Sequence, residues 1–380
     1  MIYLLGALLD SLVFLGFVVM LVPTARLAEE HARVITLRRV LIALVPATLV
    51  FLARALLLST AGGFFALVHV LYLEIVLALP LAATGVLVAG SFPTAWPLAR
   101  RLTTSVRCVA ILSLLPAPIG VWASFVEPYR LQLERSRVAL SARRAGESPL
   151  TIGVLADLQT DRITDHERRA VRRLVAGRPD IIVLPGDLFQ GSLGEFEREL
   201  PALRGLLREL QAPGGVFFVT GNTDRSLADL HRALDGSQVE IIANGVREVR
   251  VRDRRVRIAG LDAEASRTGT LPLQKDFESE PGDDDVRILL GHYPDMFLAL
   301  APDSRVDLTI AGHTHGGQIC LPWFGPPLTL TSVPRRVAAG GYHEVDGRGI
   351  YVSRGVGMER AEAPRIRFLC PPEISLLTLE

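Results

Sequence analysis

The sequence contains few cysteines, a single lysine and few charges in its first third. Its 380 residues include Cys108, Cys320 and Cys370 as the only cysteines. An odd number of cysteines without close pairs fits neither a disulfide framework nor a zinc knuckle, so both classes are excluded. Lys275 is the only lysine among 41 basic residues, which we attribute to coding bias in the genome. Low-complexity segments and internal repeats are also absent from the sequence.

Charge is distributed unevenly along the chain. Residues 1–126 hold 12 charged side chains, or about 10%, and residues 127–380 hold 69, or about 27%, where soluble domains average roughly 25%. The net charges of the two parts, +4 and −3, exclude a basic nucleic-acid-binding surface and, with 49% hydrophobic residues, argue against disorder. The sequence therefore predicts a transmembrane region at 1–126, a polar connector at 127–147 and a soluble domain at 148–380.

Four apolar stretches in the first part, residues 2–22, 40–59, 62–90 and 108–126, reach the length of a membrane-spanning helix. No basic segment precedes the first stretch, so we expect a retained anchor and not a removed signal peptide. Arg54 and Glu74 are ionisable residues inside the second and third stretches. An ion pair between two helices is favoured over a transport or proton-relay pair, because transporters usually need more than four spans.

The loop charges predict the orientation of a multi-pass protein of the cell membrane. Arginines lie in the first loop and around the third, and the short second loop has none; they are Arg26, Arg33, Arg38, Arg39, Arg100, Arg101 and Arg107. The positive-inside rule then makes loops one and three cytoplasmic. With four spans, the C-terminal domain would lie on the outer side of the membrane.

The second part alternates between short apolar runs and amphipathic stretches, the pattern of an α/β sheet covered by helices. Thr164 and Glu167 have the spacing of a capping box at the start of a helix. The expected helices are 165–176, 195–210 and 226–234, and the expected strands are 150–156, 180–184, 215–220, 239–243, 246–251, 256–259, 286–290, 307–311, 349–353 and 374–379.

Residue types that bind metals follow five of these segments. They are Asp157, Gln159, Asp187, Asn222, His292, His313 and His315. Ligands of open α/β sheets bind beyond the carboxyl ends of the strands, so we expect these side chains to converge. His313 and His315 would point the same way on an extended chain. Oxygen and nitrogen ligands without thiolate favour Mn²⁺, Fe or Zn²⁺, and a shared carboxylate is typical of a two-metal site that activates water and stabilises a phosphoryl group.

The order and spacing of these blocks resemble the calcineurin-like metallophosphoesterase superfamily, most closely its membrane-anchored bacterial members. The matching blocks are Asp157-Leu-Gln159, Gly186-Asp187, Gly221-Asn222-Thr223-Asp224, Gly291-His292 and Gly312-His313-Thr314-His315. The resemblance implies a four-layer αββα sandwich over about residues 148–380 and two divalent metal ions. It places the first ion on Asp157, Gln159, Asp187 and His315, and the second on Asp187, Asn222, His292 and His313.

Two residues depart from the family pattern. Gln159 replaces a histidine ligand, and its amide oxygen binds metals more weakly than imidazole, so we expect Asp161 to supplement it. Thr223 replaces a histidine that contacts the scissile phosphate, and a hydroxyl cannot supply a proton with a pKa near 7. The loss favours good leaving groups such as pyrophosphates, and some family members that cleave the pyrophosphate of a nucleotide-linked lipid share it. Asp224 would either bind Thr223 or, as we favour, cap the helix that begins at Ser226.

Together these features predict a membrane-anchored phosphoesterase that hydrolyses a phosphomonoester, phosphodiester or pyrophosphate bond. Asn222, Thr223 and Asp224 are its candidate catalytic residues. The expected partners are the lipid bilayer and a phosphorylated, lipid-linked substrate, with no nucleic acid. The alternative is a degenerate, non-catalytic sensor, which only Gln159 and Thr223 support. The apolar run 319–330, with Trp323 and Phe324, is either a lipid-facing lip of the site or packing over the sheet.

Overall fold

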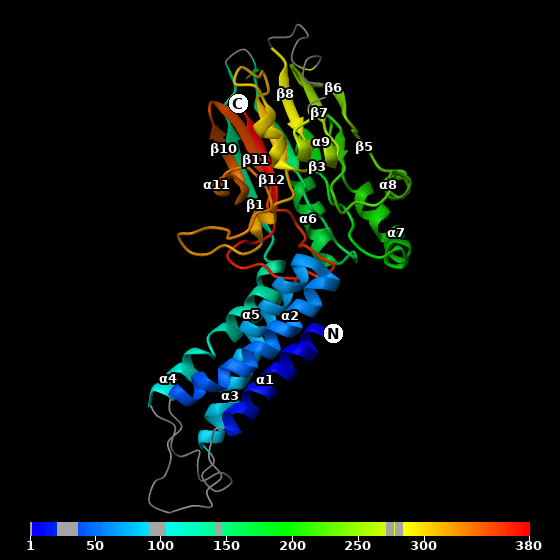
Figure 1. The fold of residues 1–380 in the computed structure, drawn as a ribbon. Helices are drawn as coiled ribbons and strands as arrows, with labels where there is room; N and C mark the ends of the chain where they lie inside the picture. The colour runs from blue at the N-terminus through cyan, green and yellow to red at the C-terminus, as the bar shows by residue number, and fades with distance from the viewer. Residues whose placement is uncertain are drawn as a thin grey trace, which may run out of the picture. The chain divides into compact units, whose positions relative to one another are not determined.

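The computed structural model describes residues 2–20, 37–91, 104–141, 144, 146–270, 277 and 284–380. The chain divides into two compact units (Figure 1). One comprises Met1–Ser124 and Glu362–Pro364, and the other comprises Phe125–Ala361 and Arg365–Glu380. The four loop arginines Arg26, Arg33, Arg100 and Arg101, like Lys275, lie outside the described residues, so the orientation inferred from these loops stays a prediction.

The described N-terminal part of the first unit is helical: α1 (Ile2–Met20), α2 (Leu37–Leu73), the π-helical η1 (Glu74–Ala78), α3 (Leu79–Ser91), α4 (Thr104–Leu112) and α5 (Pro116–Phe125). Gly63 interrupts α2 with φ 67° and ψ −159°, a backbone conformation that glycine tolerates because it has no Cβ. This break falls at the start of the third predicted span, residues 62–90. The stretches Leu41–Leu58, Gly62–Val88 and Thr104–Tyr129 are long and apolar enough to cross a membrane, whereas Ile2–Gly16 of α1 is shorter.

Three ionisable residues of the described helices are paired with one another. The Arg54 guanidinium of α2 donates hydrogen bonds to the carboxylates of Asp10 in α1 and Glu74 in η1. An isolated charge in an apolar environment is costly, and pairing reduces that cost. The ion pair favoured from the sequence is therefore present, and Asp10 extends it to a third helical segment.

The second unit contains two six-stranded sheets. The first has the order β1-β12-β2-β3-β4-β5 and the second β10-β11-β9-β8-β7-β6. The strands are β1 (Gln132–Val138), β2 (Leu150–Val154), β3 (Ile181–Pro185), β4 (Val216–Val219), β5 (Val239–Ile241), β6 (Gly245–Val251), β7 (Arg254–Gly260), β8 (Val286–Leu290), β9 (Leu308–Ala311), β10 (Gly341–Val345), β11 (Arg348–Val352) and β12 (Glu373–Leu379).

Helices cover the outer face of each sheet, as Figure 1 shows. They are α6 (Asp165–Ala176), α7 (Leu193–Arg208), α8 (Leu227–Leu234), α9 (Ala263–Thr268) and α11 (Arg335–Ala338), with 3₁₀ turns η3 (Glu127–Tyr129), η4 (Pro294–Ala299) and η5 (His315–Gly317). One buried cluster joins the first sheet to α6–α8, a second fills the space between the sheets, and a third joins the second sheet to α9, η4 and α11. The second unit thus has the expected four-layer αββα architecture.

Two strands differ from the sequence expectations. Residues 132–138, expected within a polar connector, form β1 and pair in parallel with β12. Only Val138 of this strand is buried, because β1 lies at a sheet edge and carries charged side chains. β10 at the edge of the other sheet was also not expected, and it has no fully buried residue.

Candidate metal centre

The candidate ligands follow strands of both sheets. Strands β2, β3 and β4 are parallel to one another, and so are β7, β8 and β9. Because parallel strands end at the same edge, the segments after β2, β3, β4, β8 and β9 gather there. These segments carry Asp157 and Gln159, Asp187, Asn222, His292, and His313 and His315, respectively.

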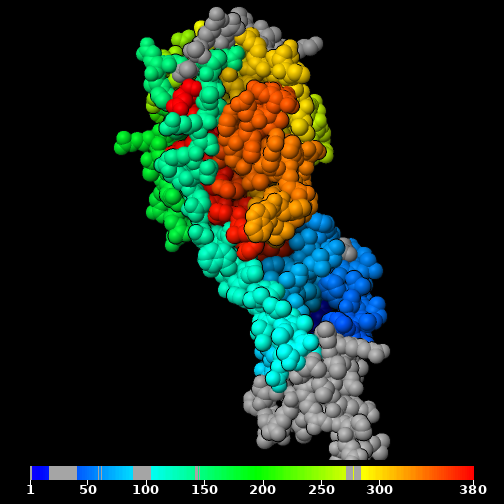
Figure 2. Space-filling view, turned by 90° about the vertical axis from the view of Figure 1, so that its left-hand side faces the viewer, coloured from blue at the N-terminus to red at the C-terminus, as the bar shows by residue number. Residues whose placement is uncertain are grey.

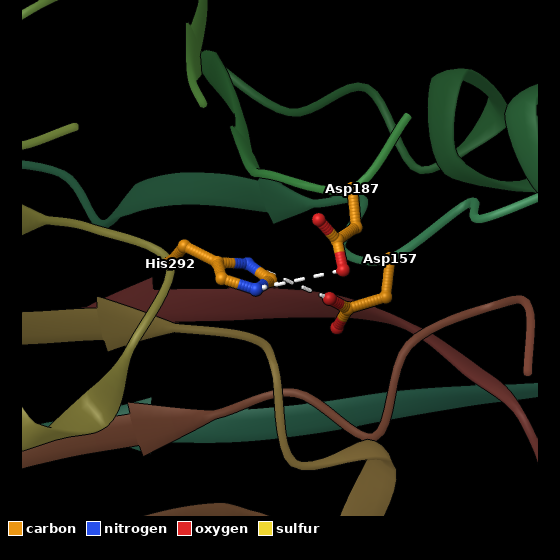
Figure 3. Close-up of side chains that lie close together, drawn as sticks. All are labelled: Asp157, Asp187 and His292. Carbon is orange, nitrogen blue, oxygen red and sulfur yellow. Dashed lines mark ion pairs between the residues drawn. The ribbon is translucent and has the colours of Figure 1, made fainter. Parts of the chain in front are cut away.

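Two carboxylates and one imidazole form the buried centre of this group (Figure 3). His292 Nε2 lies 3.5 Å from Asp187 Oδ2, and His292 Nδ1 lies 3.7 Å from Asp157 Oδ1. One ligand atom from each residue can be chosen so that all three lie within 4.8 Å of one another. Figure 3 shows the three side chains pointing toward a common point, which is the arrangement that binding of a cation requires.

Asn222 and His313 complete a cluster of acceptor atoms around His292. Asn222 Oδ1 lies 2.8 Å from His292 Nε2 and 3.1 Å from His313 Nδ1, and the two imidazole nitrogens are 3.2 Å apart. His292 Nδ1 lies 2.9 Å from the carbonyl oxygen of Pro185, so this nitrogen carries the ring proton. The His313 ring is hydrogen-bonded to the backbone of Leu330, which assigns its proton to the other nitrogen in the same way.

The resulting geometry fits a metal ion. Burial lowers the pKa of His292 to about 4 and the pKa of His313 to about 3, so both rings are neutral near pH 7. Three lone-pair atoms, Asn222 Oδ1, His292 Nε2 and His313 Nδ1, then face one another without a proton to share. Such lone pairs repel unless a cation lies between them.

The buried carboxyl groups also indicate that the site fits a metal ion. Burial raises the pKa of Asp187 and of Asp224 to about 7, and the charge of Asp187 contributes to the rise at Asp224. Burial and the neighbouring Asp187 also raise the pKa of Asp157 well above its usual range. Carboxylates this close disfavour one another's charge, and a bound cation reverses that effect.

Gln159 and His315 are buried beside this cluster but make different contacts. Gln159 Nε2 donates to Gln190 Oε1 at 3.0 Å, and its Oε1 has no hydrogen-bond partner among the described residues. A buried, unpartnered amide oxygen fits a cation ligand. His315 Nδ1 lies 3.4 Å from the Arg367 guanidinium. Among the described hydrogen bonds and ion pairs, none joins either side chain to the other five candidate ligands.

Five of the seven candidate ligands have left-handed backbone conformations. Their φ values are 44° at Asp157, 32° at Gln159, 54° at Asp187, 70° at His313 and 49° at His315. The expectation that His313 and His315 lie on an extended chain is therefore wrong, since a tight turn presents them. Non-glycine residues with positive φ are strained, and such strain persists where the surrounding structure enforces it. The His313 N–H donates to Asp157 Oδ1 at 3.0 Å, which helps hold this turn.

Glycines permit close approach between these segments. A Cβ at Gly221 would lie 2.1 Å from Asp187 Oδ1, and one at Gly312 would lie 2.6 Å from Asp157 Oδ2. Of the four glycines that directly precede a candidate ligand, only Gly186, with φ 89°, combines such contact with a left-handed backbone. Turn geometry, the reason expected from the sequence, therefore applies to Gly186, and lack of space applies to Gly221 and Gly312.

The segment after β4 is held by Asp224. Its carboxylate accepts hydrogen bonds from the backbone N–H groups of Gly221, Asp187 and Leu188, at 2.7, 3.0 and 2.7 Å. The expectation that Asp224 caps α8 is wrong, because the side chain of Ser226 performs that role. The Thr223 N–H donates to Asp187 Oδ1 at 2.9 Å, so Thr223 lies directly beside the central carboxylate.

Comparison with known proteins agrees with this geometry. The family model described as calcineurin-like phosphoesterase matches residues 150–317. The uncharacterized metallophosphoesterase YkuE of Bacillus subtilis is 30% identical over 68% of this chain and 89% of its own length. The phosphodiesterase YaeI of Escherichia coli is 29% identical over 67% and 90%. The UDP-2,3-diacylglucosamine pyrophosphatase LpxG of Chlamydia trachomatis is 26% identical over 70% and 95%.

The chain belongs to the calcineurin-like metallophosphoesterase family. It is a hydrolase of phosphoric ester bonds, and its family uses divalent metals. In this metallophosphoesterase, Asp161, which we expected to supplement Gln159, pairs with Arg360 and Arg365, at 2.7 and 2.6 Å. None of the described hydrogen bonds and ion pairs joins Asp161 to a candidate ligand.

Sequence reasoning missed three polar residues of this metallophosphoesterase centre. Glu359 accepts a hydrogen bond from Gln190 at 3.0 Å, and Gln159 Nε2 lies 3.4 Å from its other oxygen. Arg367 is completely buried and donates to the carbonyl oxygens of Arg354 and Gly357. Glu359 and Arg367 are distant from the ligands in sequence, whereas Gln190 lies three residues after Asp187. The only available signal was the polar character of residues between apolar runs.

Proposed function

We propose that this metallophosphoesterase is anchored in the membrane by residues 1–126, connected through 127–147 to a catalytic domain at 148–380, and acts on a lipid-linked phosphodiester or pyrophosphate. The observation that supports the catalytic part most strongly is the convergence of Asn222 Oδ1, His292 Nε2 and His313 Nδ1 beside Asp187. The three candidate membrane spans support the anchor.

Seven residues would hold two divalent ions, with Mn²⁺, Fe or Zn²⁺ as the metals that suit the donor set. Asp157, Gln159, Asp187 and His315 would hold one ion, and Asp187, Asn222, His292 and His313 the other. Bound there, the ions would activate water and stabilise negative charge on the phosphoryl group. Asp187 is the proposed shared ligand because it lies beside members of both sets: its Oδ2 is 3.5 Å from His292 Nε2, and its charge contributes to the raised pKa of Asp157.

Other residues of the chain would keep these ligands in place. The Pro185 carbonyl oxygen orients His292 through its Nδ1 proton, which leaves the Nε2 lone pair directed at the centre. Asp224 fixes the backbones of Gly221 and Asp187 together, so it would act as a positioning residue for both segments. Asn222 and Thr223 would lie closest to the substrate phosphate.

The substrate class is inferred from the lack of a proton donor at Thr223 and from a relative of this chain. Thr223 cannot protonate a leaving group near pH 7, which favours substrates whose leaving group departs without a proton, such as pyrophosphates. LpxG, a relative named for a lipid pyrophosphate substrate, supports the same class.

The test is hydrolysis by the full chain, purified in detergent and stripped of metal. We expect Mn²⁺ to restore cleavage of bis(p-nitrophenyl) phosphate and of a lipid pyrophosphate. Asp187→Asn should lower turnover at least about 100-fold. The matched control is Asp346→Asn, whose side chain is 83% exposed and which should behave like the parent. An absence of turnover with every divalent metal tested would support a non-catalytic sensor instead.

A further inference from the structure

Residues 319–330, which we term the lip loop, form an exposed apolar surface in the second unit. Among the described residues 130–380, nine large apolar side chains are strongly exposed, and five of them belong to this loop: Leu321, Trp323, Phe324, Leu328 and Leu330. Trp323 is fully exposed. Packing over the sheet, one of the two expectations, therefore does not describe these five side chains. Exposed apolar clusters of this kind mark interaction surfaces.

The lip loop has a defined conformation. Leu321 and Gly325 exchange two backbone hydrogen bonds, each of 2.9 Å, and Cys320 N donates to the Phe368 carbonyl oxygen at 2.8 Å. Trp323 has a φ of 64°, an unfavourable backbone conformation for a bulky residue. The structure thus holds Trp323 outward at a cost in backbone strain, which a function at the surface would explain.

One end of the lip loop contacts the candidate metal centre, and the other end is close to it in sequence. The loop begins four residues after His315, and the backbone of Leu330 near its other end is hydrogen-bonded to the ring of His313. Thr331 and Ser332, which follow, donate to the Asp295 carboxylate, at 2.5 and 2.9 Å. Whatever binds the loop is therefore brought close to the residues that would hold the metals.

The chemistry of the loop matches the surface of a lipid bilayer. Residues 319–333 contain no charged residue, and the guanidinium of Arg335 lies 4.2 Å from the ring centre of Phe324. Aromatic and leucine side chains flanked by arginine are typical of segments that lie at the boundary between headgroups and acyl chains. Figure 2 shows the golden-orange loop region on the surface of the unit.

We propose that the lip loop inserts into the bilayer and brings lipid headgroups to the metal centre. This inference rests on the proposed membrane anchoring, because three candidate spans in the same chain would keep the loop at a bilayer. A second copy of the chain is the competing occupant.

The first experiment uses Trp323 as the only tryptophan. Trp96 and Trp122 are replaced by phenylalanine in the full chain, which is reconstituted in phosphatidylcholine–phosphatidylglycerol nanodiscs. We expect blue-shifted Trp323 emission, loss of emission when dibrominated phosphatidylcholine replaces the parent lipid, and protection from acrylamide. Quenching by acrylamide without quenching by bromine overturns the inference, and a blue shift without bromine quenching assigns the loop to protein contact. A chain that alkaline carbonate extracts from native membranes refutes the anchoring itself.

The second experiment measures the ratio of kcat/KM for a lipid pyrophosphate in vesicles to that for bis(p-nitrophenyl) phosphate. We expect Trp323→Ser to lower this ratio severalfold. The matched control is Leu193→Ser, since Leu193 is equally apolar, exposed and outside the lip loop; its ratio should equal that of the parent. An unchanged ratio in Trp323→Ser would show that the loop does not deliver lipid, even with the anchoring intact.

Discussion

The side chains that meet at the strand ends have more acceptor atoms than protons. His292 and His313 each use one ring nitrogen as a donor to a backbone carbonyl oxygen, so their other nitrogens face Asn222 Oδ1 as acceptors. Unsatisfied polar groups in a protein interior cost about 1–3 kcal/mol each. The buried Nε2 of His292 and Oε1 of Gln159 therefore represent a cost that metal binding would offset.

Gln159, one of the two departures from the family pattern, gives a separate prediction. Gln159→Ala removes the unpartnered Oε1, so we expect the affinity for one of two Mn²⁺ ions to fall at least about tenfold, while the ion on His292 and His313 stays bound. Isothermal titration calorimetry of the metal-free chain would show this as the loss of one of two binding steps.

Gln190→Ala is the matched control. It removes the hydrogen-bond partner of the Gln159 amide, together with the bonds of Gln190 to Glu359 and Arg360, but leaves Gln159 Oε1 in place, so it should have the smaller effect. An isotherm of Gln159→Ala identical to that of the parent would mean that Gln159 is not a ligand.

Helix α6 illustrates how an element can be predicted from local sequence. It occupies residues Asp165–Ala176, as expected, and Thr164 and Glu167 form the capping box. The helix buries His166, whose Nε2 lies 3.1 Å from the Val356 carbonyl oxygen. Burial lowers the pKa of His166 below its usual 6.5. This single group links the stability of the element to pH.

The direction of this pH dependence follows from which state of the chain, folded or unfolded, binds the proton at His166 more readily. Below about pH 6.5 the unfolded chain binds a proton at His166 that the folded chain resists, so the contribution to stability is complete above that pH and is lost as the pH falls. We expect His166→Asn to lose less melting temperature between pH 7.5 and 5.5 than the parent. Thermal unfolding of both proteins in detergent at the two pH values measures this difference. Equal losses of melting temperature would contradict the assignment of the pH dependence to His166.

Elements that depend on neighbours distant in sequence were predicted less well. The buried strands of both sheets have continuous apolar runs, which is why most were expected within one or two residues. β1 was missed because only Val138 of its seven residues is buried. The turn at His313 and His315 and the role of Asp224 were missed because Asp157 and Leu188, which fix them, lie 156 and 36 residues away. Strand ends thus locate the site, whereas its internal hydrogen bonds require the structure.

At the scale of the whole molecule, the charged residues are concentrated in the second part of the chain. Residues before 126 carry few charges, and Arg54, one of them, is paired with Asp10 and Glu74. The recognisable ligands all lie in the charged part. The proposed anchor and the candidate ligands are therefore separate along the sequence, and the orientation of the proposed anchor would decide on which side of the membrane the ligands lie.

That orientation is testable with reporters fused after Glu380. The arginine distribution predicts that alkaline phosphatase, which is active only outside the cytoplasm, is active in the fusion, and that green fluorescent protein exported through the same route stays dark. A reversed pattern would place the catalytic domain in the cytoplasm. It would also point to 62–90 as the stretch that does not cross once.

The most direct test of the account is the number of metal ions bound per chain. Full-length protein dialysed against Mn²⁺ and then freed of unbound metal is analysed by inductively coupled plasma mass spectrometry, alongside Asp187→Asn and the exposed control Asp346→Asn. The account predicts two ions per chain in the parent and the control, and at most one in Asp187→Asn, because Asp187 is the shared ligand. Equal metal content in all three chains, or none in any, would contradict it.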